Sequence, residues 1–243
     1  MKKMIQRKNE VVSNTCDGIR FLMKKNKIDV FEGHGSFVDK NTIQVTDRND
    51  HSKILHTIST DKAIIATGSK PVTPAAFNYD KKRIITSTES LDLEKVPKRM
   101  IVIGAGVIGL ELGSVYARLG TEVEVVEFAD AVLATMDKDL GKEMQKVLKK
   151  ELGFKFHLNH MVTEVTSTTK QVTIKAKSRK DDKAMELKAD YCLIAIGRRP
   201  YTDALGLENI GVKMDDRGRI ETCLLYTSPS PRDRTRSRMP SSA

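Results

Sequence analysis

The sequence has 243 residues, of which 39% are hydrophobic and 30% charged, and this length allows one large domain or two smaller ones, each with its own core. Its longest apolar stretch, residues 100–110, is far shorter than the ~20 residues of a membrane-spanning helix, and its basic first residues precede no apolar segment of the kind found in secretory signals. The formal net charge of +10 is concentrated at the two ends, with +6 over residues 1–27 and +3 over residues 223–243, so the nearly neutral middle argues against a nucleic-acid-binding protein.

The first predicted element is a helix over residues 9–26, because apolar residues recur there at roughly helical spacing with lysines behind them. This apolar stripe consists of Val12, Ile19, Phe21, Leu22 and Met23. Four short β-like runs follow, separated by Asn, Asp and Gly, which favour turns. These runs cover residues 28–37, 42–46, 53–59 and 62–69. The pattern predicts an antiparallel β-meander.

A second unit is predicted to open at residues 96–104, and its strands and helices alternate. A strand ends in this segment, and a helix (107–119), a strand (122–127) and an amphipathic helix (137–152) follow. Asp137 begins the last helix, Lys149 and Lys150 lie in its final turn, and Gly153 follows it, as is typical of helix ends. Three more strands are predicted at the end of the unit, over residues 162–165, 171–177 and 187–196. The alternation indicates an α/β fold.

The last segment, residues 223–243, differs in composition from the rest of the sequence. It is rich in Ser, Pro and Arg and has no periodicity, which predicts disorder. An Arg/Ser-rich RNA-binding tail is one interpretation. The other interpretation, which we favour, is translated sequencing-adapter DNA, because "CLLYTSPSPRD" resembles such a product. We therefore leave this segment out of the functional argument.

The segment "GAGVIG", residues 104–109, has the G-x-G-x-x-G pattern of a dinucleotide-binding loop. The pattern is weak when it stands alone, but here the strand "MIVI" precedes it and a helix follows. Gly104 would permit the tight turn, Gly106 would let a pyrophosphate approach the backbone, and Gly109 would let the helix pack closely on the strand. The N-terminus of that helix would attract the pyrophosphate.

Glu127 ends the next predicted strand, 23 positions after Gly104. A carboxylate there accepts hydrogen bonds from the adenosine ribose 2′-OH and repels a 2′-phosphate, so it favours NAD over NADP. The following residues, "EFADAV", supply no arginine for a 2′-phosphate. Two alternatives remain at this point. Glu127 could be an ordinary strand-end carboxylate, and the loop could hold the ADP half of FAD, which uses the same fingerprint.

The segments "IIATGSKP" (64–71) and "LIAIGRRP" (193–200) flank the glycine-rich unit, and with "TMDKDLGKEMQKVLKK" and "ADYCLIAIGRRPYTDALGLENIGVKMDDRGRI" they cover most of the chain. Together they resemble the flavin-dependent pyridine nucleotide–disulfide oxidoreductases. The resemblance implies a Rossmann-like NAD-binding domain, with a parallel sheet and a β-meander, inserted into a partial FAD-binding domain. The expected bounds are 1–96 for the partial FAD-binding domain, 97–222 for the NAD-binding domain, which returns to the FAD domain near its end, and 223–243 for the tail. This insertion makes the glycine loop the NAD site.

The resemblance also implies cofactor-binding roles for individual residues. The NAD site would comprise Gly104, Ala105, Gly106, Val107, Ile108, Gly109, Leu110, Glu127, Val162 at the adenine and Gly197 at the nicotinamide. The FAD site would include Gly35, Thr67, Gly68 and Ser69, although turn formation explains these four equally simply. Glu111 matches a glutamate that lies near the flavin and pairs with a lysine, but it could equally be a favourable partner of its own helix dipole.

The activity that the resemblance implies is oxidation of dihydrolipoamide, with FAD as the bound carrier and NAD as the acceptor. Its partner would be the dihydrolipoyl domain of a 2-oxo acid dehydrogenase or glycine cleavage complex, and the whole enzyme would be a homodimer that binds neither nucleic acid nor membrane. A cytoplasmic location is expected, because the three cysteines suggest neither disulfides nor a metal site.

The chain also lacks parts of the family pattern. It contains neither the FAD glycine loop followed by a C-x-x-x-x-C redox disulfide nor the dimerisation domain with its His–Glu pair. Cys16 and Cys192 are predicted to be a helix thiol and a buried strand thiol, and the histidines are predicted to lie on surfaces or strand faces. We therefore expect an internal fragment that binds NAD, has no catalytic residues of its own and is inactive; the alternative is a stand-alone NAD-binding module.

Overall fold

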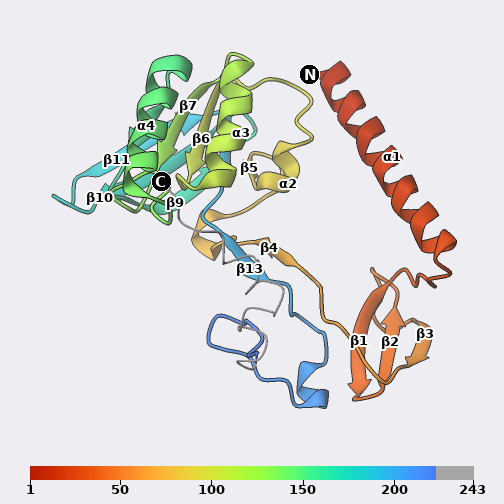
Figure 1. Cartoon of the computed structure of the whole chain (residues 1–243). Coiled ribbons are helices and arrows are strands. Elements are labelled where there is room, and N and C mark those ends of the chain that lie inside the picture. Colours follow the sequence, from red (N-terminus) through yellow and green to blue (C-terminus); the bar gives the residue numbers. More distant parts are fainter. Residues whose placement is uncertain (223–243) are drawn as a thin grey trace, which may run out of the picture. The chain divides into compact units, whose positions relative to one another are not determined.

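The computed structural model describes residues 1–222, which divide into two compact units (Figure 1). The first unit consists of Met1–Ile28 and Lys70–Arg198. The second consists of Asp29–Ser69 and the described part of Arg199–Ala243. The tail predicted over residues 223–243 lies outside the described residues. The α/β class predicted from the sequence is confirmed.

The first unit is built on a five-stranded parallel sheet with the strand order β5-β12-β6-β7-β8. These strands span Ile84–Ile85, Tyr191–Ile194, Arg99–Ile103, Glu122–Val126 and Lys155–His157, in the same order. An antiparallel sheet with the order β11-β10-β9 belongs to the same unit, and its strands span Ala184–Ala189, Val172–Ser178 and His160–Ser167. Because crossover connections join parallel strands, the five-stranded sheet is covered on both faces.

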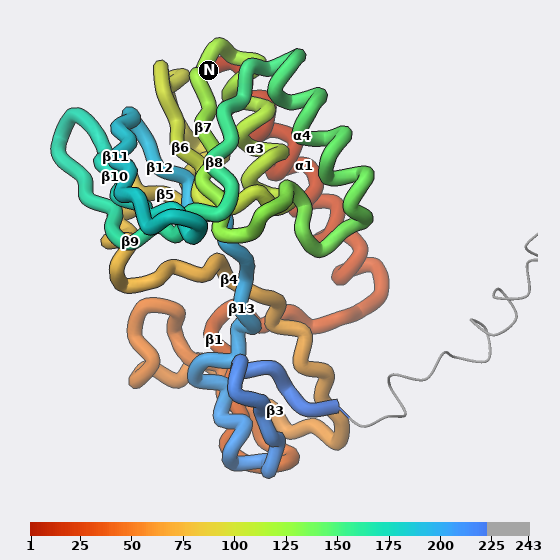
Figure 2. The backbone as a smooth tube through the Cα atoms, turned by 90° about the vertical axis from the view of Figure 1, so that its left-hand side faces the viewer, coloured from red at the N-terminus to blue at the C-terminus, as the bar shows by residue number. Residues whose placement is uncertain are grey.

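The two faces of the parallel sheet carry different cores. In the backbone view, two helices lie on one side of this sheet and the antiparallel sheet lies on the other (Figure 2). Met100 and Val102 of β6 pack with residues of helices α3 (Val107–Arg118) and α4 (Lys138–Leu152). Ile101 and Ile103, which alternate with them, pack with the antiparallel sheet. Successive side chains of a strand point to opposite faces, so β6, whose last four residues are all apolar and buried, serves both cores.

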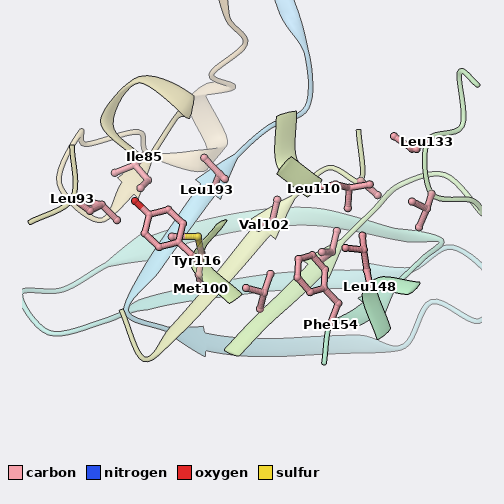
Figure 3. Packing of buried hydrophobic residues seen from close by; sticks show 14 residues of the cluster. Ile85, Leu93, Met100, Val102, Leu110, Tyr116, Leu133, Leu148, Phe154 and Leu193 are labelled. Carbon is pink, nitrogen blue, oxygen red and sulfur yellow. The ribbon is translucent and has the colours of Figure 1, made fainter. Parts of the chain in front are cut away.

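Aromatic and aliphatic side chains fill the helix side of this sheet (Figure 3). Tyr116 of α3 and Leu148 of α4 are almost fully buried, and Phe154 follows α4 directly. The Phe154 ring lies 3.1 Å from the position that a Cβ on Gly113 would take. Glycine at position 113 therefore lets α3 approach the sheet closely.

The predicted ends of α4 are confirmed. The Asp137 carboxylate accepts a hydrogen bond from the backbone N–H of Asp139 at 2.8 Å, and Gly153 ends the helix with a φ of +67°. A carboxylate at the N-cap and a left-handed glycine after the last turn satisfy backbone groups that the helix leaves unpaired. The shorter helices among the described residues were not predicted; they are α2 (Ser87–Ser90), η1 (Ala75–Phe77) and η2 (Leu207–Ile210).

The second unit contains the predicted meander, but with three strands instead of four. The strands β1 (His34–Asp39), β2 (Thr42–Thr46) and β3 (Ile54–Ser59) form one antiparallel sheet. The prediction of a fourth meander strand over residues 62–69 was wrong, because only the last of these residues is in a strand. That strand, β4 (Ser69–Pro71), pairs with β13 (Arg198–Pro200).

Two further predictions of elements need correction. The predicted helix over residues 9–26 is longer, since α1 spans Lys2–Lys25, and none of its residues is buried, so its apolar stripe is not a core face within the described residues. The single strand predicted over 187–196 is two strands, β11 and β12, in different sheets. Asp190 separates them, and its carboxylate accepts the backbone N–H groups of Lys98 and Arg99.

Among residues 1–222, no helix combines the length and apolar character that crossing a membrane requires.

Candidate functional site

A cavity of about 570 Å³ lies within the first unit, at the carboxyl ends of β6, β7 and β12. The residues that line it include Gly104, Glu127 and Ala195, each of which closely follows one of these strands. In open parallel sheets, ligands bind in the crevice outside the carboxyl ends of the strands. This cavity is therefore the candidate ligand-binding site.

The turn between β6 and α3 requires glycine at two positions. Gly104 has a φ of +105°, and a Cβ there would lie 2.5 Å from the carbonyl oxygen of Ala195. A Cβ on Gly109 would lie 2.5 Å from the carbonyl oxygen of Gly104. Both contacts are far below van der Waals distance, so any side chain would push α3 away from β6 and β12.

Gly106 has a different environment, because a Cβ there would meet nothing within 4 Å. It lines the cavity and is the N-cap of α3. No side chain within the described chain caps this helix, whereas Asp137 caps α4. The N-terminus of α3 thus combines unpaired backbone N–H groups, a positive dipole end and open space, a combination that suits an anion such as a pyrophosphate.

Glu127 follows β7, and both of its carboxylate oxygens accept backbone hydrogen bonds. Oε2 accepts the N–H of Ala105 at 2.6 Å, and Oε1 accepts the N–H of Ala129 at 2.7 Å. The backbone of Glu127 is held from the other side, since its N–H donates to His157 and its carbonyl accepts the N–H of His160, each at 2.9 Å. The half-buried carboxylate is therefore fixed beside the glycine loop.

The wall of the cavity beyond Glu127 is apolar and aromatic. Phe128, Met161 and Val162 line it together with His160. Phe128 is 53% exposed, and the guanidinium carbon of Arg179 lies 3.9 Å from the centroid of its ring. The residues that directly follow this strand in the sequence include no arginine, but the turn between β10 and β11 supplies Arg179, 52 positions after Glu127.

The other side of the cavity includes Gly197 and Arg198, which follow β12. Gly197 has a φ of +126°, and its carbonyl oxygen accepts the backbone N–H of Val72 at 3.1 Å. Pro71 also lines the cavity. The first two residues of the "GRRP" segment therefore line the same cavity as residues 104–108 of "GAGVIG".

The structure places the candidate residues in three settings. One group lines the cavity: Gly104, Ala105, Gly106, Val107, Ile108, Glu127, Val162 and Gly197. Gly109 and Leu110 pack inside the unit instead, and Glu111 is exposed on α3. The candidates for FAD, which are Gly35, Thr67, Gly68 and Ser69, belong to the second unit and do not line this cavity.

Three of the FAD candidates have structural roles of their own. Gly68 has a φ of +73°, which a glycine adopts without strain. The Thr67 hydroxyl donates a hydrogen bond to the carbonyl oxygen of Tyr201 at 2.6 Å, within the second unit. Gly35 pairs with Val45 in the β1–β2 ladder. These observations describe the turn and strand surroundings of the residues and do not test a flavin contact.

The thiols and histidines do not form a reactive group within the described residues. Cys16 is exposed on α1, and Cys192 is buried in β12, where burial raises the pKa of its thiol. His157 contacts the Glu124 carboxylate at 2.9 Å. Burial raises the pKa of Glu124, but the His157 hydrogen bond and the Lys155 charge lower it by more. The net pKa is therefore below its ordinary value. Residues 1–222 contain no group of three or more His, Cys, Asp or Glu side chains arranged to hold a metal ion.

Comparison with known proteins gives a consistent result. A family model described as pyridine nucleotide-disulphide oxidoreductase matches residues 1–223. The dihydrolipoyl dehydrogenases of Dictyostelium discoideum and Bacillus subtilis are 44% and 39% identical to the chain over 220 residues, which is 90% of this chain. The solved structure of the HOCl-induced flavoprotein disulfide reductase RclA from Escherichia coli matches with a TM-score of 0.72 and 30% identity, and the match covers 90% of this chain and 48% of that one. The chain spans 44% and 45% of the length of the two dehydrogenases.

Proposed function

The chain belongs to the pyridine nucleotide-disulphide oxidoreductase family, and from this premise we propose that residues 97–222 form the NAD-binding domain of a dihydrolipoyl dehydrogenase. Residues 1–96 would be part of the FAD-binding domain, to which the chain returns near residue 222. The identity to dihydrolipoyl dehydrogenases supports this assignment. The grouping of Asp29–Ser69 with the described residues from Arg199 onward supports a return of the chain, one that begins at Arg199, before the end of the 97–222 segment.

One observation carries the proposal for NAD. The uncapped N-terminus of α3, the open space at Gly106 and the fixed carboxylate of Glu127 belong to one cavity. These are the features that the two polar parts of a dinucleotide require, since the pyrophosphate needs donors and the ribose hydroxyls need an acceptor. The residues present therefore fit the adenosine diphosphate half of NAD.

Each group of the cavity would have a distinct binding role. The N–H groups at the start of α3 would hold the pyrophosphate, and Glu127 would accept from the ribose 2′-OH. Val162 would contact the adenine, and Gly197 would lie at the nicotinamide. A 2′-phosphate beside the Glu127 carboxylate would be repelled, so we propose NAD and not NADP as the nucleotide.

The proposal for FAD rests on the family alone. When bound in the whole enzyme, FAD would carry electrons from a dithiol to the nicotinamide. Gly35, Thr67, Gly68 and Ser69 would contribute to its site, but they do not line the cavity described above. We therefore assign nucleotide binding to the residues of this chain, and we assign no electron-transfer step to them.

We also propose that this polypeptide is inactive as a dehydrogenase by itself. Oxidation of a dithiol by this family uses a protein disulfide, and the 243 residues contain no C-x-x-x-x-C pair. In the whole enzyme, a partner dihydrolipoyl domain and a second subunit would complete the reaction.

Two measurements on the purified 243-residue chain test these proposals. Calorimetry should show binding of NADH and much weaker binding of NADPH or single-stranded RNA. An assay of dihydrolipoamide oxidation, with FAD and NAD⁺ present, should show no NADH formation. Absence of NADH binding would contradict the nucleotide assignment, and NADH formation would contradict the inactivity.

A further inference from the structure

Arg179 lies in the turn between β10 and β11 and packs on Phe128, the residue after Glu127. Its guanidinium carbon is 3.9 Å from the centre of the Phe128 ring. Its Nη1 also donates a hydrogen bond to the Phe128 carbonyl oxygen at 3.0 Å. One side chain thus holds both the ring and the backbone of Phe128.

The backbone of Arg179 reaches the same segment by a second route. Its N–H donates to the Asn159 carbonyl oxygen at 2.7 Å, and the Asn159 N–H donates to the Ala129 carbonyl oxygen at 2.9 Å. The Ala129 N–H in turn donates to Oε1 of Glu127 at 2.7 Å. The turn that carries Arg179 is therefore linked to the carboxylate through Asn159 and Ala129.

Phe128 needs such support because the residue is 53% exposed while it lines the cavity. An exposed aromatic side chain without a neighbour moves among rotamers, and ordering it on ligand binding costs free energy. A guanidinium over the ring face holds the ring by cation–π attraction and by stacking of two planar groups. The Phe128 wall is thus ordered before a ligand arrives.

We propose that Arg179 is a positioning residue for the adenosine half of the dinucleotide. It holds Phe128 as the wall beside the adenine and keeps residues 127–129 in the conformation in which Glu127 meets the ribose. This inference rests on the proposed NAD site. It assigns to Arg179 no contact with the nucleotide, because its side chain is already engaged by Phe128.

The test compares Arg179→Ala with Lys180→Ala in the full chain. Both variants remove one positive charge from the same turn, but only Arg179 contacts Phe128. Calorimetry with NADH and with ADP-ribose should show that Arg179→Ala weakens both ligands by the same factor, roughly threefold to tenfold. Lys180→Ala should change neither affinity by more than about twofold. In a Phe128→Leu background, Arg179→Ala should have a much smaller effect than in the wild type.

A second measurement needs no ligand. Amide hydrogen exchange of the free protein should be faster at Ala129 and Asn159 in Arg179→Ala than in the wild type and in Lys180→Ala. Unchanged exchange, or equal loss of affinity in the two variants, would overturn the positioning role. If the wild type binds neither NADH nor ADP-ribose, the proposed NAD site is wrong, and the exchange measurement still decides whether Arg179 orders the segment.

Discussion

The Glu127 carboxylate accepts a hydrogen bond from the backbone N–H of Ala105 at 2.6 Å, which ties the end of β7 to the glycine loop after β6. The second carboxylate oxygen is engaged by Ala129 at 2.7 Å. A charged acceptor with two backbone donors is oriented before any ribose binds, because both oxygens have fixed partners. The residue that we propose selects the nucleotide therefore also shapes the loop that would hold the pyrophosphate.

Substitution of Glu127 should separate this selective role from general binding. Glu127→Gln keeps the shape but offers one acceptor oxygen instead of two, and we expect NADH affinity to fall about tenfold or more. Glu127→Arg should abolish NADH binding, so the affinities for NADH and NADPH should differ less than in the wild type. Calorimetry with both nucleotides measures these changes. The control is Glu122→Gln, since Glu122 is exposed at the opposite end of the same strand. Wild-type affinity in Glu127→Gln would contradict the assignment.

The glycines of the loop should respond to alanine in opposite ways. A Cβ at Gly106 meets open space, so Gly106→Ala should lower the free energy of unfolding by only about 0.5–1 kcal/mol, the cost of alanine at an N-cap. It should nevertheless weaken NADH binding, because the methyl group would occupy the position of the pyrophosphate.

Gly109→Ala should instead destabilise the fold, by roughly 1–3 kcal/mol, because its Cβ would lie 2.5 Å from the Gly104 carbonyl oxygen. Chemical denaturation and NADH titration of the two variants check both expectations. The interpretation of Gly106 is wrong if Gly106→Ala binds NADH as the wild type does.

The elements around the loop were predictable because their signals are local. A strand, three glycines, a helix and an acidic residue at the end of the next strand fix the β6–α3–β7 unit, and Asp137 and Gly153 mark the ends of α4. The capping box of α2, with Thr86 as the N-cap and Glu89 at N3, is also a local signal, but the helix is too short to show periodicity.

Other features depend on partners distant in sequence. The run 187–196 is mostly apolar, and only the pairing of β11 with β10 and of β12 with β6 shows that it changes sheets at Asp190. Arg179 lies 51 positions after Phe128, and no spacing rule joins a hairpin turn to a strand end. The glycine loop and Glu127 could therefore be proposed from the sequence, but the contact of Arg179 with Phe128 could not.

Asp80 gives a prediction about acid stability. Its carboxylate accepts the backbone N–H groups of Lys82, Arg83 and Ile84 and the Ser167 hydroxyl. Burial raises the pKa of Asp80, but these hydrogen bonds outweigh it, so the net pKa lies below the usual 3.8. A carboxyl group whose pKa is lower in the folded state contributes stability above its unfolded pKa and loses it as the pH falls through the folded pKa.

We therefore expect Asp80→Asn to lower the free energy of unfolding at pH 7 by about 1–2 kcal/mol. The difference from the wild type should shrink below pH 3.8, as the wild-type carboxyl group becomes protonated. Denaturation with urea at a series of pH values measures it. A difference that stays constant from pH 7 to the acid limit would show that the charge of Asp80 is not the cause.

The two described cysteines should differ sharply in reactivity. Thiolates are the reactive form of cysteine, and burial in β12 raises the pKa of Cys192 and shields its sulfur, whereas Cys16 is exposed on α1. With a chromogenic thiol reagent, Cys16→Ser should remove one rapidly reacting thiol from the native protein, and Cys192→Ser should remove none. After unfolding in guanidinium, each variant should show one reactive thiol fewer than the unfolded wild type. Cys223 is present in both and cancels in the comparison. A rapid reaction of Cys192 in the native protein would contradict its burial and would reopen the question of a redox role for this thiol.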